Sequence, residues 1–354
     1  MVDPEGKLPL PWLAAALDEA LRTQRGHALL IHGPQGIGQF ELGLTLAQSW
    51  LCEAAPAGST AAGPFKPACG RCASCHLVQA RSHPDLLVLL PEALRESLGW
   101  DSADDGDSDA KASKAKPSKE LKVEAIRGAV NFAQTTSARG RGKVVLLHPA
   151  ERMNGISANT LLKTLEEPPG QARFILSSGS PDALLPTIRS RCQALPLALP
   201  PTDQATRWLA EHKIAQPEVL LAAAGGQPLQ ALDWAQDGVD AVAWLRLPKQ
   251  LAAGDAGQLA AWPLPRLLEA MHKLCHDALC LSCGAPPRYF PPASLPAAMP
   301  LYGLTRWAAS LSAASRHGEH PWNQPVMVES LVQQAREALA PARHVKGPSV
   351  HSAR

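Results

Sequence analysis

A glycine-rich turn between an apolar run and a helical pattern constrains the fold of this chain more than any other feature. The run HALLI (27–31) leads into GPQGIGQF (33–40), and the helical pattern FELGLTLAQSWLC follows. This order is typical of a P-loop, G-x-x-x-x-G-K-[ST], whose Lys and hydroxyl side chains bind the β- and γ-phosphates and Mg²⁺. A glutamine and a phenylalanine replace these two groups, so we predict a P-loop scaffold that binds no nucleotide. This degenerate loop consists of Gly33, Gly36, Gly38, Gln39 and Phe40.

Short apolar runs alternate with helical patterns over the first 198 residues. Beyond HALLI, the runs are DLLVLL, KVVLLH, RFILSS and QALPLA, at 85–90, 143–148, 173–178 and 193–198. Continuous apolar strands separated by helices are typical of a parallel sheet that is covered on both faces. We therefore expect an α/β domain over residues 1–198.

The rest of the chain has helical patterns and loops. A proline pair ends the α/β pattern, and we expect a small helical module over 199–242 and a larger helical domain over 243–340. The stretch 95–120 is acidic and then rich in Lys, Ser and Ala, so we expect a disordered surface insertion there. The tail, 341–354, is also expected to be disordered.

Composition describes a globular protein. The 354 residues are 45% hydrophobic and 19% charged, and a net charge of +2 does not indicate a polyanion partner for the whole chain. The N-terminus does not resemble a signal peptide, and no stretch approaches the ~20 apolar residues of a membrane span. The expected location is the cytoplasm, where cysteines serve as thiols or metal ligands more often than in disulfides.

The most specific metal-ligand pattern is CGRCASC. It holds Cys69, Cys72 and Cys75, and C-x-x-C spacing lets thiolates converge on one tetrahedral Zn²⁺ ion. Cys52, at the end of the preceding helical pattern, is the favoured fourth ligand, and His76 is the alternative. With four protein ligands the site would be structural. Metal-free thiols and an Fe–S cluster are the competing interpretations.

The remaining cysteines are expected to pack rather than react. Cys275, Cys280 and Cys283 lie in a strongly helical run, where cysteine usually behaves as a small hydrophobic residue. Cys192 borders a strand and is expected to be buried.

A second part of the phosphate chemistry is also missing. In nucleotide-hydrolysing P-loop proteins, a later strand ends in acids that hold Mg²⁺ and polarise the attacking water. In KVVLLHPAERM the acid positions hold His148 and Pro149, and Glu151 lies off register. We therefore do not expect this chain to hydrolyse ATP. An active ATPase with a divergent P-loop is the alternative, because amides at a helix N-terminus can bind phosphate without the Lys.

Two later motifs lie near the end of the α/β pattern. LLKTLEEPP (161–169) belongs to a helix that Ser157 is expected to cap. LLPTIRSRCQ then places Arg189 and Arg191 in a polar turn. From the turn alone both arginines are expected to be ordinary surface charges. The alternative is an arginine finger, a guanidinium supplied to the γ-phosphate of a neighbouring subunit.

Together these stretches resemble the clamp-loader branch of the AAA+ family. The matching motifs are GPQGIGQF, the cysteine cluster, RSHPD (81–85), LLKTLEEPP and SRC (190–192). The resemblance implies an AAA+ α/β domain with a zinc module (52–75), followed by a helical lid and an all-α collar domain. These correspond to the three segments expected above.

The resemblance also implies a function. It indicates a non-hydrolysing accessory subunit of the DNA polymerase III holoenzyme, which supports ATP-dependent loading of the sliding clamp onto primed DNA. Arg191 falls on the family's trans-acting arginine finger, which reverses the expectation from the turn alone. Leu229 stands where ATP-using relatives place a phosphate-sensing Arg, and 177–179 offer no clear sensor threonine. The zinc ligands of the family fall on Cys52, Cys69, Cys72 and Cys75.

The implied partners are other parts of the same machine. They are gamma- or tau-like ATPase subunits, the delta subunit, the sliding clamp indirectly, and primer-template DNA, with no membrane. RGRGK (139–143) is the candidate for contacts to DNA phosphates. A zinc-finger DNA-binding protein is a competing class, but no Lys/Arg-rich helix follows the cysteines.

Overall fold

The computed structural model describes residues 1–24, 26–54, 66–100, 117–297, 299–316 and 323–340. The chain divides into two compact units, Met1–Gln204 and Ala205–Arg354, and the boundary falls within helix α8 (Thr202–Glu211). Among the described residues, no helix combines the length and the apolar character needed to cross a membrane.

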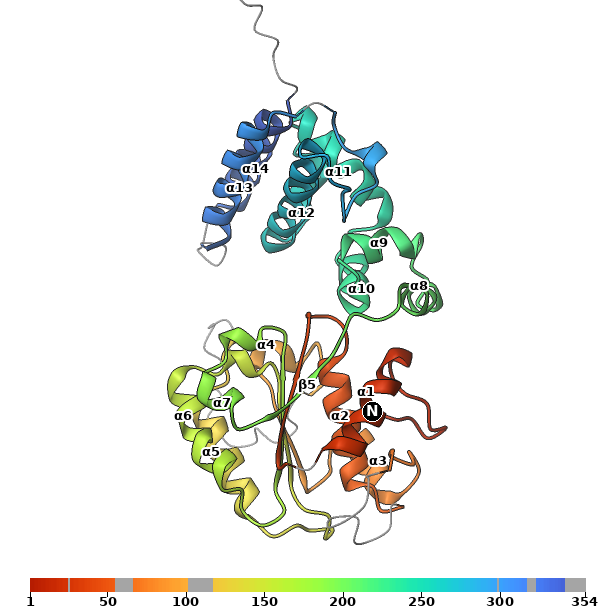
Figure 1. The fold of residues 1–354 in the computed structure, drawn as a ribbon, viewed down its shortest axis with the longest axis vertical. Coiled ribbons are helices and arrows are strands. Elements are labelled where there is room, and N and C mark those ends of the chain that lie inside the picture. The colour runs from red at the N-terminus through yellow and green to blue at the C-terminus, as the bar shows by residue number, and fades with distance from the viewer. Residues whose placement is uncertain (25, 55–65, 101–116, 298, 317–322, 341–354) are drawn as a thin grey trace, which may run out of the picture. The chain divides into compact units, whose positions relative to one another are not determined.

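The first unit is built on a parallel sheet of five strands in the order β2-β3-β4-β1-β5 (Figure 1). Leu30 of β1 pairs with Leu176 of β4 on one side and with Ala194 of β5 on the other. Because all strands are parallel, their carboxyl ends form one edge of the sheet and their amino ends the other. The strands are β1 (Ala28–His32), β2 (Leu86–Leu89), β3 (Val144–Leu147), β4 (Arg173–Ser178) and β5 (Gln193–Pro196).

Helices cover both faces of this sheet. The strands alternate their side chains between the faces. Leu30 and Phe174 pack with α5 and α6, while Leu146 and Ile175 lie against Gly43 of α2, where a Cβ would be 2.8 Å from Leu146 Cδ1. The helices are α1 (Ala14–Thr23), α2 (Gln39–Leu51), α3 (Ala73–Gln79), α4 (Glu92–Arg95), α5 (Val123–Gln134), α6 (Gly155–Glu166) and α7 (Pro186–Arg189), with 3-10 turns η1 (Pro11–Leu13), η2 (Ala150–Arg152) and η3 (Pro181–Ala183).

The start of α6 differs from the prediction. Asn154, not Ser157, is the N-cap, and its side chain accepts a hydrogen bond from the amide of Ser157 at 2.9 Å. The hydroxyl of Ser157 instead donates to the carbonyl of Leu121 at 3.0 Å. The prediction was wrong because Asn also caps helices well, and a contact distant in sequence engages the serine.

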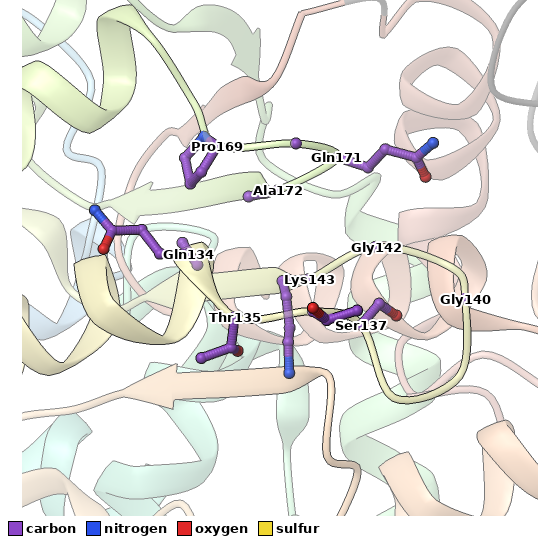
Figure 2. A pocket seen from close by; sticks show the side chains of 12 residues that line it. Gln134, Thr135, Ser137, Gly140, Gly142, Lys143, Pro169, Gln171 and Ala172 are labelled. Atoms are coloured by element: carbon purple, nitrogen blue, oxygen red, sulfur yellow. The ribbon is translucent and has the colours of Figure 1, made fainter.

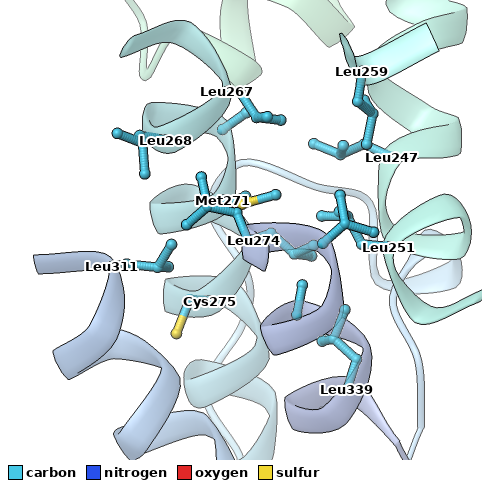
Figure 3. Packing of buried hydrophobic residues seen from close by; sticks show 14 of the residues in the cluster. Leu247, Leu251, Leu259, Leu267, Leu268, Met271, Leu274, Cys275, Leu311 and Leu339 are labelled. Carbon is cyan, nitrogen blue, oxygen red and sulfur yellow. The ribbon is translucent and has the colours of Figure 1, made fainter. Parts of the chain in front are cut away.

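The second unit is helical throughout its described secondary structure. Its core gathers side chains from α11, α12, α13 and α14, among them Leu247, Met271, Leu311 and Leu339 (Figure 3). Burying one such side chain contributes about 1.5–3 kcal/mol. After α8 the elements are α9 (Pro217–Ala223), α10 (Pro228–Gln236), α11 (Ala241–Ala253), η4 (Gly257–Ala261), α12 (Leu264–Ser282), η5 (Pro292–Ser294), α13 (Leu301–Arg316) and α14 (Gln324–Leu339).

The α/β class with a parallel sheet, followed by a helical region, is thus confirmed. Within the second unit, the ring centroids of Trp234 in α10 and Trp244 in α11 lie 4.9 Å apart, so residues on both sides of position 242 share one core. The division into a lid (199–242) and a collar (243–340) stays a prediction.

The predicted disordered insertion lies partly outside the described residues, and the predicted disordered tail lies wholly outside them. Residues 101–116 of the insertion and the tail 341–354 are not among the described residues. The flanks of the insertion are held in place. The amide of Ser118 donates to Glu92 at 3.0 Å, and the guanidinium of Arg81 lies over the ring of Trp100 at 5.6 Å.

The cysteines of the second unit are divided. Cys275 packs in the core of Figure 3, 1% exposed, as predicted. Cys280 is half-buried but outside the core cluster and Cys283 is exposed, so core packing was wrong for both. The reason is local, because Cys283 is the C-cap of α12 and lies beyond its buried face.

Candidate functional site

The side chain of Gln39 fills the P-loop turn from which it projects. β1 ends at His32, the glycine turn follows, and α2 begins at Gln39. Gly36 and Gly38 adopt positive φ angles of 72° and 104°, which glycine tolerates at little cost. Nε2 of Gln39 donates to the carbonyls of Gly33, at 2.9 Å, and Pro34. The side chain that replaces the phosphate-binding Lys is 5% exposed and bonded to the loop itself.

The N-terminal segment covers the other side of this turn. Nε1 of Trp12 donates to the carbonyl of Ile37 at 2.8 Å. Leu10 approaches Gly38 so closely that a Cβ on the glycine would lie 2.5 Å from Leu10 Cδ1. The backbone of the turn is therefore packed against the chain's own residues.

An aromatic pair joins Phe40, at the P-loop hydroxyl position of the sequence motif, to His148, at one of its acid positions. The ring of Phe40 lies 5.0 Å from the ring of His148, and Nδ1 of His148 lies 2.9 Å from Oγ of Ser177. Burial lowers the pKa of His148 to about 4, so its imidazole is neutral at pH 7. The predicted loss of the acids at 148 and 149 therefore leaves an uncharged, tightly packed cluster. The sequence singled out His148, but it did not indicate that Ser177 would be its partner.

The nearest retained acid has a different task. Oε1 of Glu151 accepts a hydrogen bond from the amide of Gly179 at 3.0 Å. It thereby fastens the turn that follows β4. Leu229, predicted at the position of a phosphate-sensing Arg, lies in α10 of the other unit and is half-buried.

The four predicted metal ligands lie together. Cys52 is the C-cap of α2, Cys72 is the N-cap of α3, and Cys75 lies in that helix. Their Sγ atoms and that of Cys69 all lie within 4.8 Å of one another, with 3.9 Å between Cys52 and Cys72. Tetrahedral zinc with Zn–S bonds of about 2.3 Å separates its sulfurs by about 3.8 Å. His76, the alternative ligand, points its Nδ1 to Gln79 Oε1 at 3.2 Å instead.

Backbone amides face these sulfurs. The amide of Cys72 donates to Cys69 Sγ at 3.3 Å, and the amide of Cys75 donates to Cys72 Sγ at 3.4 Å. Burial opposes ionisation of Cys69, but amide hydrogen bonds from Arg71 and Cys72 outweigh it and lower the pKa to about 7. Burial raises the pKa of Cys75. Four thiols this close together fit a closed metal site. A bound cation there would favour their thiolate forms.

The N-terminal segment also reaches this cysteine cluster. Val2 is 2% exposed and packs with Cys52 and Cys75. Its amide donates to Gln48 Oε1 at 2.7 Å, and its carbonyl accepts from Gln79 Nε2 at 2.9 Å. One segment, residues 2–13, thus contacts both the cysteine cluster and the P-loop turn.

RSHPD (81–85) joins the cysteine helix to the sheet. Nδ1 of His83 accepts from the amide of Asp85 at 3.0 Å, so its Nε2 donates to Ser74 Oγ of α3 at 2.6 Å. Asp85 is 0% exposed, and its carboxylate accepts from Ser137 Oγ and the amides of Ala138 and Arg139. The sequence pattern does not indicate this role of the motif as a structural junction, because its partners lie in other segments.

The basic side chains of the loop RGRGK bond to two other segments of the first unit. Lys143 pairs with Asp85 at 3.0 Å, Arg139 donates to Glu53 Oε1 at 2.7 Å, and Arg141 donates to the carbonyl of Glu53 at 3.1 Å. The loop borders a cavity of ≈ 390 Å³ between the α5–β3 and α6–β4 connections, where Lys143 lies beside Thr135 and Ser137 (Figure 2). Contacts between this loop and DNA phosphates stay a prediction.

The turn that bears Arg191 lies between α7 and β5. Nε of Arg191 donates to Glu166 Oε1 at 2.6 Å, and the guanidinium also donates to the carbonyl of Thr187 at 2.9 Å. Arg189 instead pairs with the exposed Asp182 at 2.7 Å. Cys192 is half-buried against the core of the first unit rather than fully buried, and burial raises the pKa of its thiol to about 12.

The two ends of the sheet separate this turn from the P-loop. The P-loop follows β1 at the carboxyl edge, whereas Arg191 precedes β5 at the amino edge. β1 and β5 are hydrogen-bonded in parallel, with Leu29 opposite Gln193. The guanidinium therefore lies at the opposite edge of the sheet from the P-loop of its own chain.

Comparison with known proteins adds an independent line of evidence. The family model described as DNA polymerase III, delta subunit, matches residues 12–201. The chain is 38% identical over 226 residues to DNA polymerase III subunit delta′ of Pseudomonas aeruginosa (62% of this chain, 60% of the relative). It is 33% identical over 229 residues to the delta′ subunit of Escherichia coli K12 (63% and 59%). The matches thus span about three fifths of these relatives.

More distant likenesses were also found. The chain is 30% identical over 242 residues to DNA polymerase III subunit tau of Salmonella typhimurium, which covers 68% of this chain and 32% of that protein. A gamma subunit-related protein of Thermotoga maritima superimposes with a TM-score of 0.48 at 15% identity, covering 92% and 99% of the two chains. The family match extends over more than half of the sequence and is supported by the delta′ relatives. This chain belongs to the delta-prime family of DNA polymerase III subunits.

Proposed function

We propose that this chain is a non-hydrolysing subunit of a DNA polymerase III clamp loader. In this role it supports ATP-dependent loading of a sliding clamp onto primed DNA, and it supplies Arg191 to the ATP site of a neighbouring subunit. Its partners are ATPase subunits of the gamma or tau type and a delta subunit in the cytoplasm. Contacts to the clamp and to primer-template DNA arise within the assembly.

The position of Arg191 is the observation that carries this proposal. A strand rises about 3.3 Å per residue, so β5 alone separates the two edges of the sheet by roughly 13 Å. Arg191 lies before β5 and the P-loop lies after β1. A guanidinium at the amino edge is thus remote from phosphates bound at the carboxyl edge of its own sheet. It is suited to a γ-phosphate held by an adjacent subunit.

The filled P-loop supports the non-hydrolysing part. Gln39 donates to the loop carbonyls, and Phe40 and His148 pack where the hydroxyl and the acids of an ATPase would hold Mg²⁺. A neutral imidazole beside a phenyl ring offers no anionic ligand to a hard cation, which prefers carboxylate and water oxygens. Hydrolysis therefore belongs to the neighbour.

Zinc is the proposed occupant of the cysteine site. Cys52, Cys69, Cys72 and Cys75 supply four soft ligands at tetrahedral spacing, which suits Zn²⁺ and leaves no coordination position for a substrate. The site would therefore act in folding. It would fasten the end of α2, the start of α3 and the N-terminal segment to one another.

A reconstituted complex with its ATPase subunits tests the arginine. We expect Arg191→Ala to slow single-turnover ATP hydrolysis at the site it completes by up to ~10³-fold, while the complex still assembles. Arg189→Ala is the matched control, because it lies in the same turn but pairs with the exposed Asp182. Full ATPase activity in the Arg191→Ala complex would overturn the assignment.

An assay of the isolated chain tests the proposal that it does not hydrolyse ATP. We expect no ATP turnover above that of a mock preparation. Turnover that co-purifies with the chain and disappears in Gln39→Ala would instead favour an active ATPase with a divergent P-loop.

A further inference from the structure

Arg191 is held by its own subunit on two sides. Nε of the guanidinium donates to Oε1 of Glu166 at 2.6 Å, one terminal nitrogen forms an ion pair with the same oxygen, and the other terminal nitrogen donates to the carbonyl of Thr187 at 2.9 Å. The side chains of Arg191 and Glu166 are 33% and 46% exposed, so another molecule can approach the pair. A carboxylate thus occupies the side of the guanidinium that is best suited to bind an anion.

Glu166, the residue that pairs with Arg191, is held in place by the packing of α6 against the sheet. Glu166 is the last residue of α6, and the preceding Leu165 is 1% exposed in the core. The ring of His27, just before β1, hydrogen-bonds the carbonyl of Leu165. The end of α6 is therefore anchored at the same amino edge that bears the turn of Arg191.

Carboxylate and phosphate bind a guanidinium in the same way. Both accept two parallel N–H bonds from its planar fork, so an arginine that is paired with a carboxylate must exchange it to receive a phosphate. We propose that Glu166 is a positioning residue that holds Arg191 on its own subunit until the γ-phosphate of the neighbour's nucleotide displaces it. This inference rests on the proposed function of Arg191. The pairing with Glu166 lowers the rate enhancement that Arg191 gives to the neighbouring ATP site. It also releases Arg191 only when that site holds a nucleoside triphosphate.

Replacing the charge tests this role. An exposed ion pair of this kind contributes at most about a factor of five to an equilibrium. In the reconstituted complex, we expect Glu166→Gln to raise kcat/KM for ATP by about two- to fivefold, because the amide keeps the hydrogen-bonding shape without the charge. The gain should shrink at high salt, since screening weakens the wild-type pair. A purely structural role predicts the opposite, a loss of activity.

Three controls separate the outcomes. Glu167→Gln changes the adjacent, exposed carboxylate and should leave the kinetics unchanged. Glu166→Asp, which keeps the charge, should return kcat/KM towards the wild-type value. In the double variant Glu166→Gln/Arg191→Ala, the gain should vanish, because it acts through Arg191. A gain that persists without the arginine would overturn the inference.

The failure of each proposal has its own signature. If Arg191→Ala lowers hydrolysis but Glu166→Gln lowers or does not change kcat/KM, only the positioning role of Glu166 fails. If Arg191→Ala has no effect, the proposed function fails with it. Thermal unfolding of the Glu166→Gln chain checks that the fold is intact, and we expect only a small shift for a pair that is this exposed.

Discussion

The ring of His148 lies 5.0 Å from the ring of Phe40, and its Nδ1 lies 2.9 Å from the hydroxyl of Ser177. Phe40 and His148 stand at the sequence positions that hold a hydroxyl and a carboxylate in a P-loop ATPase. Both side chains contribute to the packing around the P-loop turn.

Restoring the P-loop consensus should therefore damage the protein. We expect Gln39→Lys/Phe40→Thr to lower the free energy of unfolding by about 3 kcal/mol, since Phe40 is 5% exposed and its loss leaves a cavity. Urea denaturation measures the loss. ATP turnover should stay at background, because the acids at 148 and 149 are still missing. A variant as stable as the parent would contradict this view of the site.

Stability should fall in mild acid because of His148. Burial lowers its pKa to about 4 in the folded protein, against about 6.5 in an unfolded chain. The unfolded state binds more protons between these values, so the free energy of unfolding falls as the pH drops from about 6.5 towards 4. At 1.36 kcal/mol per pKa unit, His148 accounts for up to about 3 kcal/mol.

Urea denaturation at a series of pH values checks this slope. His148→Asn keeps a neutral polar group but cannot titrate, so it should remove that part of the pH dependence. Parallel pH profiles for the parent and the variant would show that His148 is not responsible. The comparison also removes contributions from His83, whose pKa burial likewise lowers.

Metal removal should loosen the N-terminal segment. We expect the purified chain to retain zinc, and chelation or Cys75→Ala to release it and lower the melting temperature by about 10 °C, equivalent to about 3 kcal/mol. Hydrogen exchange should speed up at the amide of Val2, which is bonded to Gln48. Cys280→Ser, in the other unit, is the control and should change neither quantity. Unchanged exchange after metal loss would argue against this coupling.

Asp85 should be the most sensitive carboxylate of the first unit. Asp85→Ala leaves Lys143 buried without its counter-charge and removes the acceptor for the amides of Ala138 and Arg139. Breaking such a buried pair costs about 3–5 kcal/mol. Asp182→Ala, whose side chain is 96% exposed, should cost less than about 0.5 kcal/mol. Chemical denaturation of the two variants gives the comparison.

The sequence predicted the features that depend on local patterns. Apolar runs predicted the five strands, and cysteine spacing with the helix end at Cys52 predicted the group of four thiols that the structure brings together. The loss of the P-loop Lys and of the acid pair could also be seen by position alone.

Contacts between distant segments could not be predicted in this way. The sequence does not indicate that Trp12 would bond to Ile37, that Glu166 would pair with Arg191, or that Asp85 would bind a loop more than fifty residues away. The cap of α6 was wrong for a related reason, since Asn154 and Ser157 have similar propensities and a distant carbonyl decides between them. These contacts depend on tertiary packing, which local pattern does not encode.

The separation of the P-loop and Arg191 on opposite edges of one sheet also bears on how such a chain can diverge. Gln39 and Phe40 lie at the carboxyl edge, so a substitution at either position is separated from the turn before β5 by the length of that strand. Selection can thus act on one edge while the other drifts. Under the proposed function, selection for the contribution that Arg191 makes to a neighbouring subunit can maintain the turn before β5 independently of what happens at the P-loop.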